Sequence, residues 1–417
     1  MSKDFLHKKF LKNSEKISKW FQAETAQAKY PIYSSYDIRD AGYKMANVDA
    51  NIFPAGFNNI CPTDKETAPD LFKLYIDGHY SNVKKILLVP EEHSGNAYYW
   101  ENAITIKELI ETAGYEVKVG FAKSLDAPII MKSVSGKEVL VESAMPDSEL
   151  VNNFKPDLIV SNNDFSDPHE EWGESIKIAM NPPRGLGWYQ RKKSRYFKHY
   201  NDLVNEFCEI VGEDPFKFRV ETKEFANFDI NSEESRQALA KEVDLFLTDL
   251  KTEYDKRGVA QKPFAFVKNN AGTYGLAVIK VESGQDVLDW SYKSRKKMKA
   301  AKGGREVEEV IIQEGIPSIV KSDGASAEPV IYMVGCELAG GFLRTHVEKS
   351  DTESLNSPGA VYKRMCVTDL EVRPEDCPNE NVYGWSAKLG MLAISREAAE
   401  MSVHFKNYVA RPCCKQD

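Results

Sequence analysis

Residues 264–279 include residue types that could hold the phosphates of a nucleotide. They read FAFVKNNAGTYGLAVI, so Lys268 ends one expected strand and the next begins after a loop containing Gly272, Thr273, Tyr274 and Gly275. A lysine at a strand end is a fixed positive charge, and glycines let backbone N–H groups approach phosphate oxygens closely. Ordinary hairpin turns share this pattern, and the chain contains no GxxxxGK[ST] phosphate loop. By itself the segment is compatible with a nucleotide site and with a plain turn.

Residues further along the chain follow in an order that suits the rest of a nucleotide site. The expected strand VIIQEGI ends in Gln313, Glu314, Gly315 and Ile316, a pattern suited to a hinge whose backbone groups bond the edge of adenine. Glu328 opens the following strand, where a carboxylate could accept the hydroxyl groups of a ribose. Together with Lys268, these residues predict a nucleotide-binding site.

A candidate catalytic arginine lies on the next expected strand. The stretch ELAGGFLRTH carries Arg344, and the loop ESLNSPGA that follows carries Asn356 and Gly359. Arg344 lies among apolar residues, where an unpaired charge would be costly unless a ligand or a carboxylate meets it. We therefore expect Arg344 to bind substrate and act in catalysis, with Asn356 and Gly359 beside it.

Two oxygen-bearing residues near the N-terminus have the spacing of a metal site. In an extended VDANIF segment, Asp49 and Asn51 point to the same side, and hard oxygen donors on one face suit Mg²⁺. The alternative is a turn in which Asn51 supports a loop. Arg39 is a candidate for gripping a substrate carboxylate through its guanidinium fork, or else forms an ion pair with Asp37 or Asp40.

Other polar residues are weaker candidates for binding an amino acid. Asn58 follows the proposed metal segment, Asn96 precedes an expected helix, and Asn162 and Asn163 end the expected strand DLIVSNN. Polar residues that merely end strands are common, so each could be structural. For the basic run at 191–193, a solvated helix face is favoured over contact with phosphate or substrate.

The elements that must position these residues are of two kinds. Residues 84–121 read as strand, polar turn, amphipathic helix and strand, which is a βαβ unit. Beyond about residue 260, five strand candidates and one helix indicate an α+β lobe. We expect an N-terminal helix with the metal and substrate segment (1–80), a βαβ substrate lobe (81–182), a helical connector (183–260), and a nucleotide lobe with a closing helix (261–417).

The composition argues against several classes of partner. The formal net charge is −8 and the sequence pI is about 5.6, so the protein as a whole repels nucleic acid and anionic membranes. No apolar run approaches the about 18 residues that suggest a membrane span, and no secretion signal is recognisable. Seven scattered cysteines without a CxxC pair argue against a disulfide framework, and Cys413 and Cys414 are expected in an unstructured tail. We expect a soluble, cytoplasmic protein. The sequence does not reveal its oligomeric state and leaves a homo-oligomer open.

The motifs VKNNAGTYG, VIIQEG, AEPVIYMVG, GGFLRTH and SLNSPGAVYK resemble the ATP-grasp form of glutamate-cysteine ligase found in some proteobacteria. With DIRDAGYKMANVDANIFPAGFNNI, SNNDFS and RKKSRYF, the resemblance covers most of residues 34–364. The order of motifs is also similar to that of permuted, eukaryotic-type glutathione synthetases, in which an early acid-x-Asn motif binds metal, as Asp49-x-Asn51 would here. One departure is that the loop NNAGTYG lacks the glutamate that completes the metal shell in those synthetases. Asn270, Glu328 or another acid could replace it.

The resemblance implies an ATP-grasp fold with a Rossmann-like βαβ lobe, ATP and Mg²⁺ as cofactors, and ligation of glutamate to cysteine. The γ-carboxylate of glutamate would attack the γ-phosphate of ATP, and the cysteine amine would displace phosphate from γ-glutamyl phosphate. This would give γ-glutamylcysteine, the first step of glutathione synthesis. One alternative is a glutathione synthetase or another ATP-grasp ligase, and a second is a non-catalytic nucleotide-binding regulatory protein.

Overall fold

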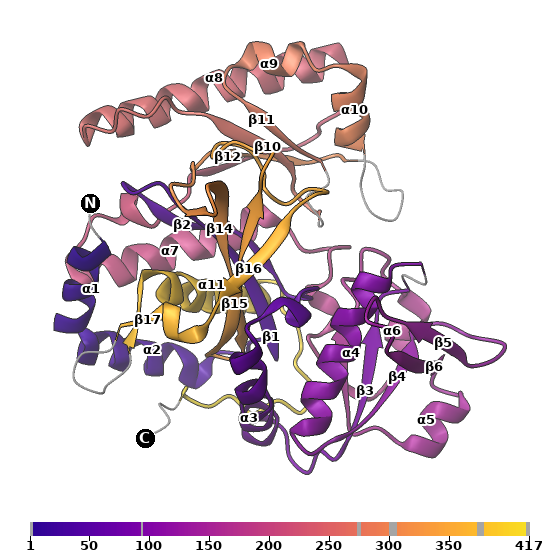
Figure 1. Ribbon diagram of the computed structural model, residues 1–417. Helices are drawn as coiled ribbons and strands as arrows, with labels where there is room; N and C mark the ends of the chain where they lie inside the picture. The colour runs from indigo at the N-terminus through magenta and orange to yellow at the C-terminus, as the bar shows by residue number, and fades with distance from the viewer. Residues whose placement is uncertain (1–2, 93–94, 273–276, 300–306, 373–378, 414–417) are drawn as a thin grey trace.

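The computed structural model describes residues 3–92, 95–272, 277–299, 307–372 and 379–413, and Figure 1 shows three bodies built around three sheets. The central sheet has the order β16-β15-β14-β1-β2, with β13 beside β14. Its strands, all paired antiparallel, are β1 (Tyr33–Asp40), β2 (Met45–Asn51), β13 (Lys321–Ser322), β14 (Ala325–Val334), β15 (Glu337–His346) and β16 (Val361–Met365). Segments almost 300 residues apart in sequence therefore form one sheet.

One face of the central sheet is covered by helices. The helix α11 (Val382–Glu400) contacts β1, β2 and β14, and α7 (Lys193–Val211) packs against α11. Nearly every side of α11 is buried, as expected for a helix enclosed in a core. Gly390 permits this close approach, because a Cβ there would lie 2.5 Å from the ring of Tyr36 on β1. The helices α1 (Lys3–Lys12) and α2 (Ser14–Gln27) complete this layer. The opposite face carries the site, and there α3 (Pro62–His79) packs against part of β14 and β15.

The second body, here called the parallel lobe, covers residues 85–181 and has the strand order β5-β6-β4-β3-β7-β8. Its strands are β3 (Lys85–Pro90), β4 (Glu116–Phe121), β5 (Ile129–Lys132), β6 (Glu138–Ser143), β7 (Leu158–Asn162) and β8 (Ala179–Asn181). Only β5 pairs antiparallel, at the sheet edge. The helices nearby are α3 (Pro62–His79), α4 (Ala97–Thr112), α5 (Glu149–Phe154) and α6 (Glu170–Ser175). The predicted βαβ lobe is confirmed.

The third body, here called the small lobe, covers residues 222–314 and has a core of its own. Its sheet has the order β11-β10-β12-β9, formed by β9 (Thr222–Phe225), β10 (Ala265–Asn269), β11 (Val278–Val281) and β12 (Val310–Glu314). The long helix α8 (Glu233–Lys256) buries Leu239 and Val243 against Val267 and Ile312 of this sheet. The short helices α9 (Gly284–Leu288) and α10 (Tyr292–Lys299) lie at its edge.

The division into lobes cuts across the segments expected from sequence. Residues 222–256 of the expected connector supply β9 and α8 to the small lobe. Residues 325–365 join the central sheet, where β14 pairs with β1, and do not pair with β10. The remaining elements are short: η1 (Phe57–Asn59), η2 (Arg184–Leu186), η3 (Pro215–Lys217), η5 (Val367–Leu370), β17 (Glu371–Val372) and β18 (Asn379–Glu380). No helix in the described residues combines the length and the apolar character that a bilayer crossing needs.

The cysteine pattern is where the sequence expectation is wrong. Cys61 pairs with Cys366 and Cys336 pairs with Cys413, across 305 and 77 residues of sequence respectively. Cys413 is therefore fixed to the turn between β14 and β15 and does not lie in a loose tail. Spacing along the chain could not reveal these pairs, because cysteines so far apart in sequence meet only in the folded chain.

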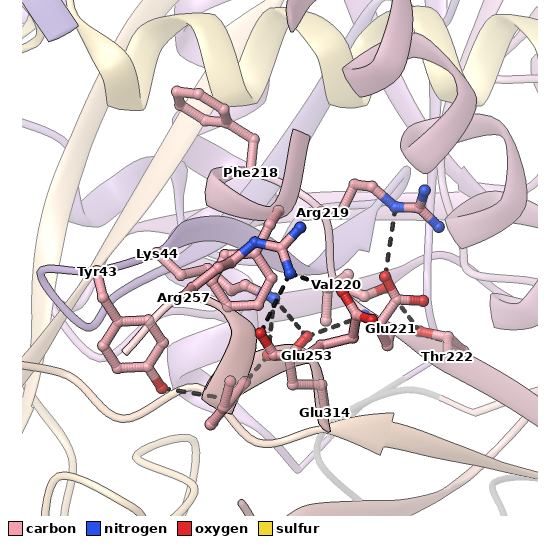
Figure 2. Close-up of polar contacts among 12 residues, drawn as sticks. Tyr43, Lys44, Phe218, Arg219, Val220, Glu221, Thr222, Glu253, Arg257 and Glu314 are labelled. Carbon is pink, nitrogen blue, oxygen red and sulfur yellow. Dashed lines mark hydrogen bonds and ion pairs between the residues drawn. The ribbon is translucent and has the colours of Figure 1, made fainter. Parts of the chain in front are cut away.

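A buried ion pair joins the small lobe to the central sheet. Lys44, in the turn between β1 and β2, lies 2.7 Å from both carboxylate oxygens of Glu314 at the end of β12, and neither side chain is exposed. The hydroxyl of Tyr254 on α8 and the backbone N–H of Glu221 also donate to Glu314, and the Phe216 ring lies 4.0 Å from the Lys44 ammonium. Figure 2 shows Lys44, Glu221 and Glu314 close together. Removing one partner of a buried charge pair with this many hydrogen bonds is strongly destabilising, because the other charge stays buried without compensation.

Replacing Lys44 with Met should lower the free energy of unfolding by about 3–5 kcal/mol, because Glu314 would remain as a buried, uncompensated charge. Thermal unfolding followed by circular dichroism measures the change. The matched control is Lys73→Met, which breaks an exposed pair with Asp77 and should cost at most about 1 kcal/mol. Equal stability of the two variants would show that the Lys44 pair does not hold the lobe.

Candidate active site

The free face of the central sheet presents a row of polar and charged side chains. Asp37 on β1 is the register partner of Asp49 on β2, and Glu328 on β14 is the partner of Arg344 on β15. Directly opposed residues in antiparallel strands point to the same side, and so do residues two apart on one strand. The same face therefore carries Ser35, Asn51, Tyr332 and Tyr362. We call this face the floor of the site.

Two adjoining cavities lie over this floor. The first, of about 650 Å³, lies between the floor and the small lobe. It is lined by Asp37, Arg39, Val48, Asp49, Lys193, Phe266, Lys268, Gly272, Val278, Gln313, Glu314, Ile316, Glu328, Ser354 and Asn356. The second, of about 820 Å³, extends along the floor over Asn51, Tyr332 and Arg344, with Asn59 and Trp188 at its side. Asp37, Asp49 and Asn356 line both, so they mark where the two cavities meet.

Most of the residues predicted for the nucleotide and the reacting groups are brought together here. The first cavity gathers Lys268 and Gly272 from one predicted motif, and Gln313, Glu314 and Ile316 from another. Arg344 and Asn51 line the second cavity, and Asn356 lines both. Gly359 has a φ of +96° and lies beside the ring of His346. Thr273, Tyr274 and Gly275 lie outside the described residues.

Four charges on the floor neutralise one another. Arg344 Nη1 lies 2.6 Å from Asp37 and 2.8 Å from Glu328, and Arg39 Nε lies 2.5 Å from Glu328. Burial favours the neutral form of Glu328, but Arg39 and Arg344 hold the pKa of that carboxyl below its usual range. Burial also opposes the charge on Arg344, yet Asp37 and Glu328 raise its pKa. Nε of Arg344 has no hydrogen-bond partner within the described structure, although its residue is only 8% exposed.

Lys268 provides a cation inside the first cavity. Its ammonium donates to Gln313 Oε1 at 2.5 Å and to the backbone oxygen of Val48 at 3.2 Å, which ties β10 to β12 and to the floor. Burial lowers the pKa of Lys268 to about 8, although Asp49 nearby opposes that shift. Gln313 is thus a side-chain partner of Lys268, and its amide also donates to Thr222 at 3.3 Å.

A second cation, Lys193, comes from the basic run for which a solvated helix face was favoured over contact with phosphate or substrate. At the first residue of α7, Lys193 is bonded to Asp49 and lines the first cavity. Burial disfavours ionisation of Asp49, but Lys193 and Lys268 lower the pKa of that carboxyl. Its neighbours are equally occupied: buried Arg191 pairs with Glu397 and donates to Ala50, and Lys192 pairs with Glu309. The favoured interpretation of this run as a solvated helix face is therefore wrong.

Other predicted residues lie outside both cavities. Asn96 caps α4 by accepting from the Tyr99 N–H, and Asn162 bonds to Pro54, Tyr99 and Asn102. Asn163 accepts from the Phe165 N–H, and Asn58 donates to Asn59, which itself lines the second cavity. Each of these four side chains thus makes at least one hydrogen bond within the protein. Their substrate roles stay predictions.

Comparisons with known proteins identify this arrangement. The model of the glutamate-cysteine ligase family matches residues 7–398. The chain belongs to the glutamate-cysteine ligase family. A solved structure described as a γ-glutamylcysteine synthetase, from Methylobacillus flagellatus KT, is 32% identical with a TM-score of 0.84, covering 95% of this chain and 96% of that one. A comparison with curated proteins found no match.

Two further solved structures are much more distant from this ligase. A glutathione synthetase-like effector from Globodera pallida is 12% identical with a TM-score of 0.36, covering 86% of this chain and 81% of that one. D-alanyl-alanine synthetase A from Vibrio cholerae is 13% identical with a TM-score of 0.32, covering 77% and 81%. These TM-scores are too low to support an inference. The predicted family, the mixed helix-and-sheet fold class and the C–N bond-forming ligase activity are confirmed.

The pKa of Lys268 predicts how nucleotide binding by the ligase depends on pH. Because burial lowers this pKa to about 8, the ammonium loses its proton, and its attraction for phosphate, as the pH rises through that value. If the charged form alone binds, affinity for ADP should be about tenfold weaker at pH 9 than at pH 7. Isothermal titration calorimetry measures the affinity at each pH. Lys268→Arg, which stays charged throughout, should bind ADP equally well at both pH values. The same affinity at pH 7 and pH 9 in the wild type would refute the assignment of Lys268 to the phosphates.

Proposed function

We propose that the chain joins glutamate to cysteine through γ-glutamyl phosphate, using the first cavity for ATP and the second for the amino acids. The observation that carries this proposal is the meeting of the two cavities at Asp37, Asp49 and Asn356. A triphosphate in the first cavity with its γ-phosphate at the junction would lie beside a carboxylate held in the second. Proximity of this kind removes much of the entropic cost of the reaction between them.

The side chains divide the work of charge neutralisation. A carboxylate is a poor electrophile, so its oxygen first attacks the γ-phosphorus, and ADP leaves. Lys268 and Lys193 lie where they would hold the phosphate oxygens. Arg344, whose Nε is unpartnered in the described structure, would face the oxygens of the acyl phosphate and of the tetrahedral species formed by the attacking amine. Such a preorganised donor is worth roughly 3–4 kcal/mol.

The oxygen donors at the junction fit Mg²⁺. Asp37, Asp49 and Asn51 lie on one face of two paired strands and offer the hard oxygen atoms that this ion prefers. Glu328, considered above as a replacement for the missing loop glutamate, has both oxygens in close contact with two arginines, and Asn270 is bonded to Ser194. Asp37 makes its close contact with Arg344 through Oδ2, and its Oδ1 lies 3.4 Å from Arg344 Nη2. We therefore propose Asp37 as the third ligand. When bound, Mg²⁺ would neutralise the phosphate charge that develops during transfer.

The composition and the substrates also support the kind of partner and the cellular location expected from the sequence. The net charge of −8 supports small-molecule substrates over nucleic acid. ATP, glutamate and cysteine are cytoplasmic metabolites, which supports a cytoplasmic site of action.

Lys268→Ala should reduce turnover by about 10²- to 10³-fold while the fold survives, because a preorganised cation at the phosphates is lost. The assay supplies ATP, glutamate and cysteine and records phosphate release together with γ-glutamylcysteine. Lys137→Ala, on the exposed surface of the parallel lobe, is the control and should keep full activity. Near-normal turnover by Lys268→Ala would remove the nucleotide site, and phosphate release only with γ-glutamylcysteine and glycine would favour a glutathione synthetase.

Asp37→Asn should weaken binding of Mn²⁺, used here in place of Mg²⁺, by about tenfold or more in the presence of ADP, because a charged ligand is lost. Electron paramagnetic resonance measures the bound Mn²⁺. The control is Asp323→Asn, whose carboxylate is exposed and pairs with Lys363. Asp37 also binds Arg344, so a slower reaction alone would not identify its role. Unchanged Mn²⁺ affinity with reduced turnover would show that Asp37 only orients Arg344.

A further inference from the structure

All three guanidinium nitrogens of Arg39 are engaged by the protein itself. Nε lies 2.5 Å from Glu328 on the floor, Nη1 donates to the backbone oxygen of Asp351 at 3.1 Å, and Nη2 donates to that of Glu353 at 2.8 Å. Arg39 is only 5% exposed. A guanidinium is the only side-chain group with donors in a fork that can reach one carboxylate and two separate carbonyls at once.

The two carbonyls belong to an unusually long connection between β15 and β16. Residues 347–360 join these adjacent antiparallel strands, whereas roughly two to five residues suffice for most hairpins. Within it, Ser354 lines the first cavity, Asn356 lines both, and Leu355 between them is fully buried. Residues 350–356 are here called the shared wall.

The shared wall is also tied to the small lobe. Lys280 on β11 donates to Thr352 Oγ1 at 2.9 Å, and the N–H of Ser318, which follows β12, donates to the same Asp351 oxygen that Arg39 contacts. One short segment therefore makes hydrogen bonds to the floor and to the small lobe, and both of these line the first cavity. Its order depends on both.

We propose that Arg39 is a positioning residue that holds residues 350–356 as a shared wall, and that nucleotide and amino acid bind cooperatively through this wall. Either ligand would immobilise the wall from its own side, and the second ligand would then meet a wall already ordered. The second ligand does not have to order the wall again, so it binds more tightly once the first is bound. By linkage, each ligand then raises the affinity for the other by the same factor. The proposal rests on the assignment of the two cavities made above, and it replaces the expectation that Arg39 grips a substrate carboxylate.

The test measures binding without turnover, using a non-hydrolysable ATP analogue and glutamate with cysteine omitted. In the wild type, saturating glutamate should tighten the analogue by about fivefold or more, and the analogue should tighten glutamate by the same factor. Arg39→Lys keeps the charge opposite Glu328 but lacks the fork. It should lose most of this reciprocal tightening, and the amides of residues 350–356 should exchange hydrogen faster than in the wild type.

Two further variants separate the wall from the buried charges. Asn356→Ala leaves every Arg39 contact in place and should reduce the tightening while amide protection of the wall is kept. Lys363→Met removes an exposed cation on β16 just after the connection and should behave as the wild type does. If Arg39→Lys does not fold, the result for Asn356→Ala decides, because full tightening in that variant overturns the proposal.

The remaining outcomes are equally distinct. Wild-type tightening and exchange in Arg39→Lys would overturn the proposal, and so would loss of glutamate binding with normal exchange, which would mean that Arg39 holds the substrate directly. A wild-type enzyme that binds both ligands without mutual tightening would overturn the coupling and leave the proposed function intact. A wild type that binds neither ligand would overturn both.

Discussion

The site depends on a sheet face that carries charges which would be unstable alone. Asp37, Glu328, Arg39 and Arg344 lie on the floor, mostly buried, and each has an oppositely charged partner within 2.8 Å. A buried charge without its partner costs several kcal/mol, so these four side chains stabilise one another only as a set. The packing of α11 behind the sheet keeps their strands in register. This set leaves Nε of Arg344 without a partner beside a cavity, ready for an anionic ligand.

One hairpin, β1–β2, connects the charged floor to both neighbouring parts. Its strands supply Asp37 and Asp49 at the junction of the cavities, and its turn supplies Lys44, which pairs with Glu314 of the small lobe. Arg39, between them, holds the shared wall. The β1–β2 hairpin carries the acidic groups. It therefore sets both the position of the small lobe over the proposed phosphate site and the position of the shared wall beside that site. The same hairpin therefore carries the acidic groups of the site and anchors the small lobe and the shared wall.

The sequence was informative wherever function depends on local pattern. Period-two spacing placed Asp49 and Asn51 on one face. Gln313 and Glu314, predicted to form an adenine hinge at the same nucleotide site as Lys268, line the first cavity together with Lys268. Pairing between distant strands could not be predicted in this way. Glu328 was interpreted as a ribose ligand, because nothing local shows that β14 lies beside β1 and brings Arg39 and Arg344 to its carboxylate. A solvated position was favoured for Lys193 for the same reason, since its partner Asp49 is 144 residues away.

The charge balance of the site supports the proposal that a divalent cation binds there. Among the described cavity residues, Arg39, Lys193, Lys268 and Arg344 are cationic, and Asp37, Asp49, Glu314 and Glu328 are anionic. Lys44 cancels Glu314 from behind, so these side chains leave a single net positive charge. A triphosphate and a substrate carboxylate bring several negative charges into this partly desolvated space, where each unbalanced charge is expensive. The protein alone cannot neutralise them, and oxygen donors at the junction of the cavities are what a bridging cation requires.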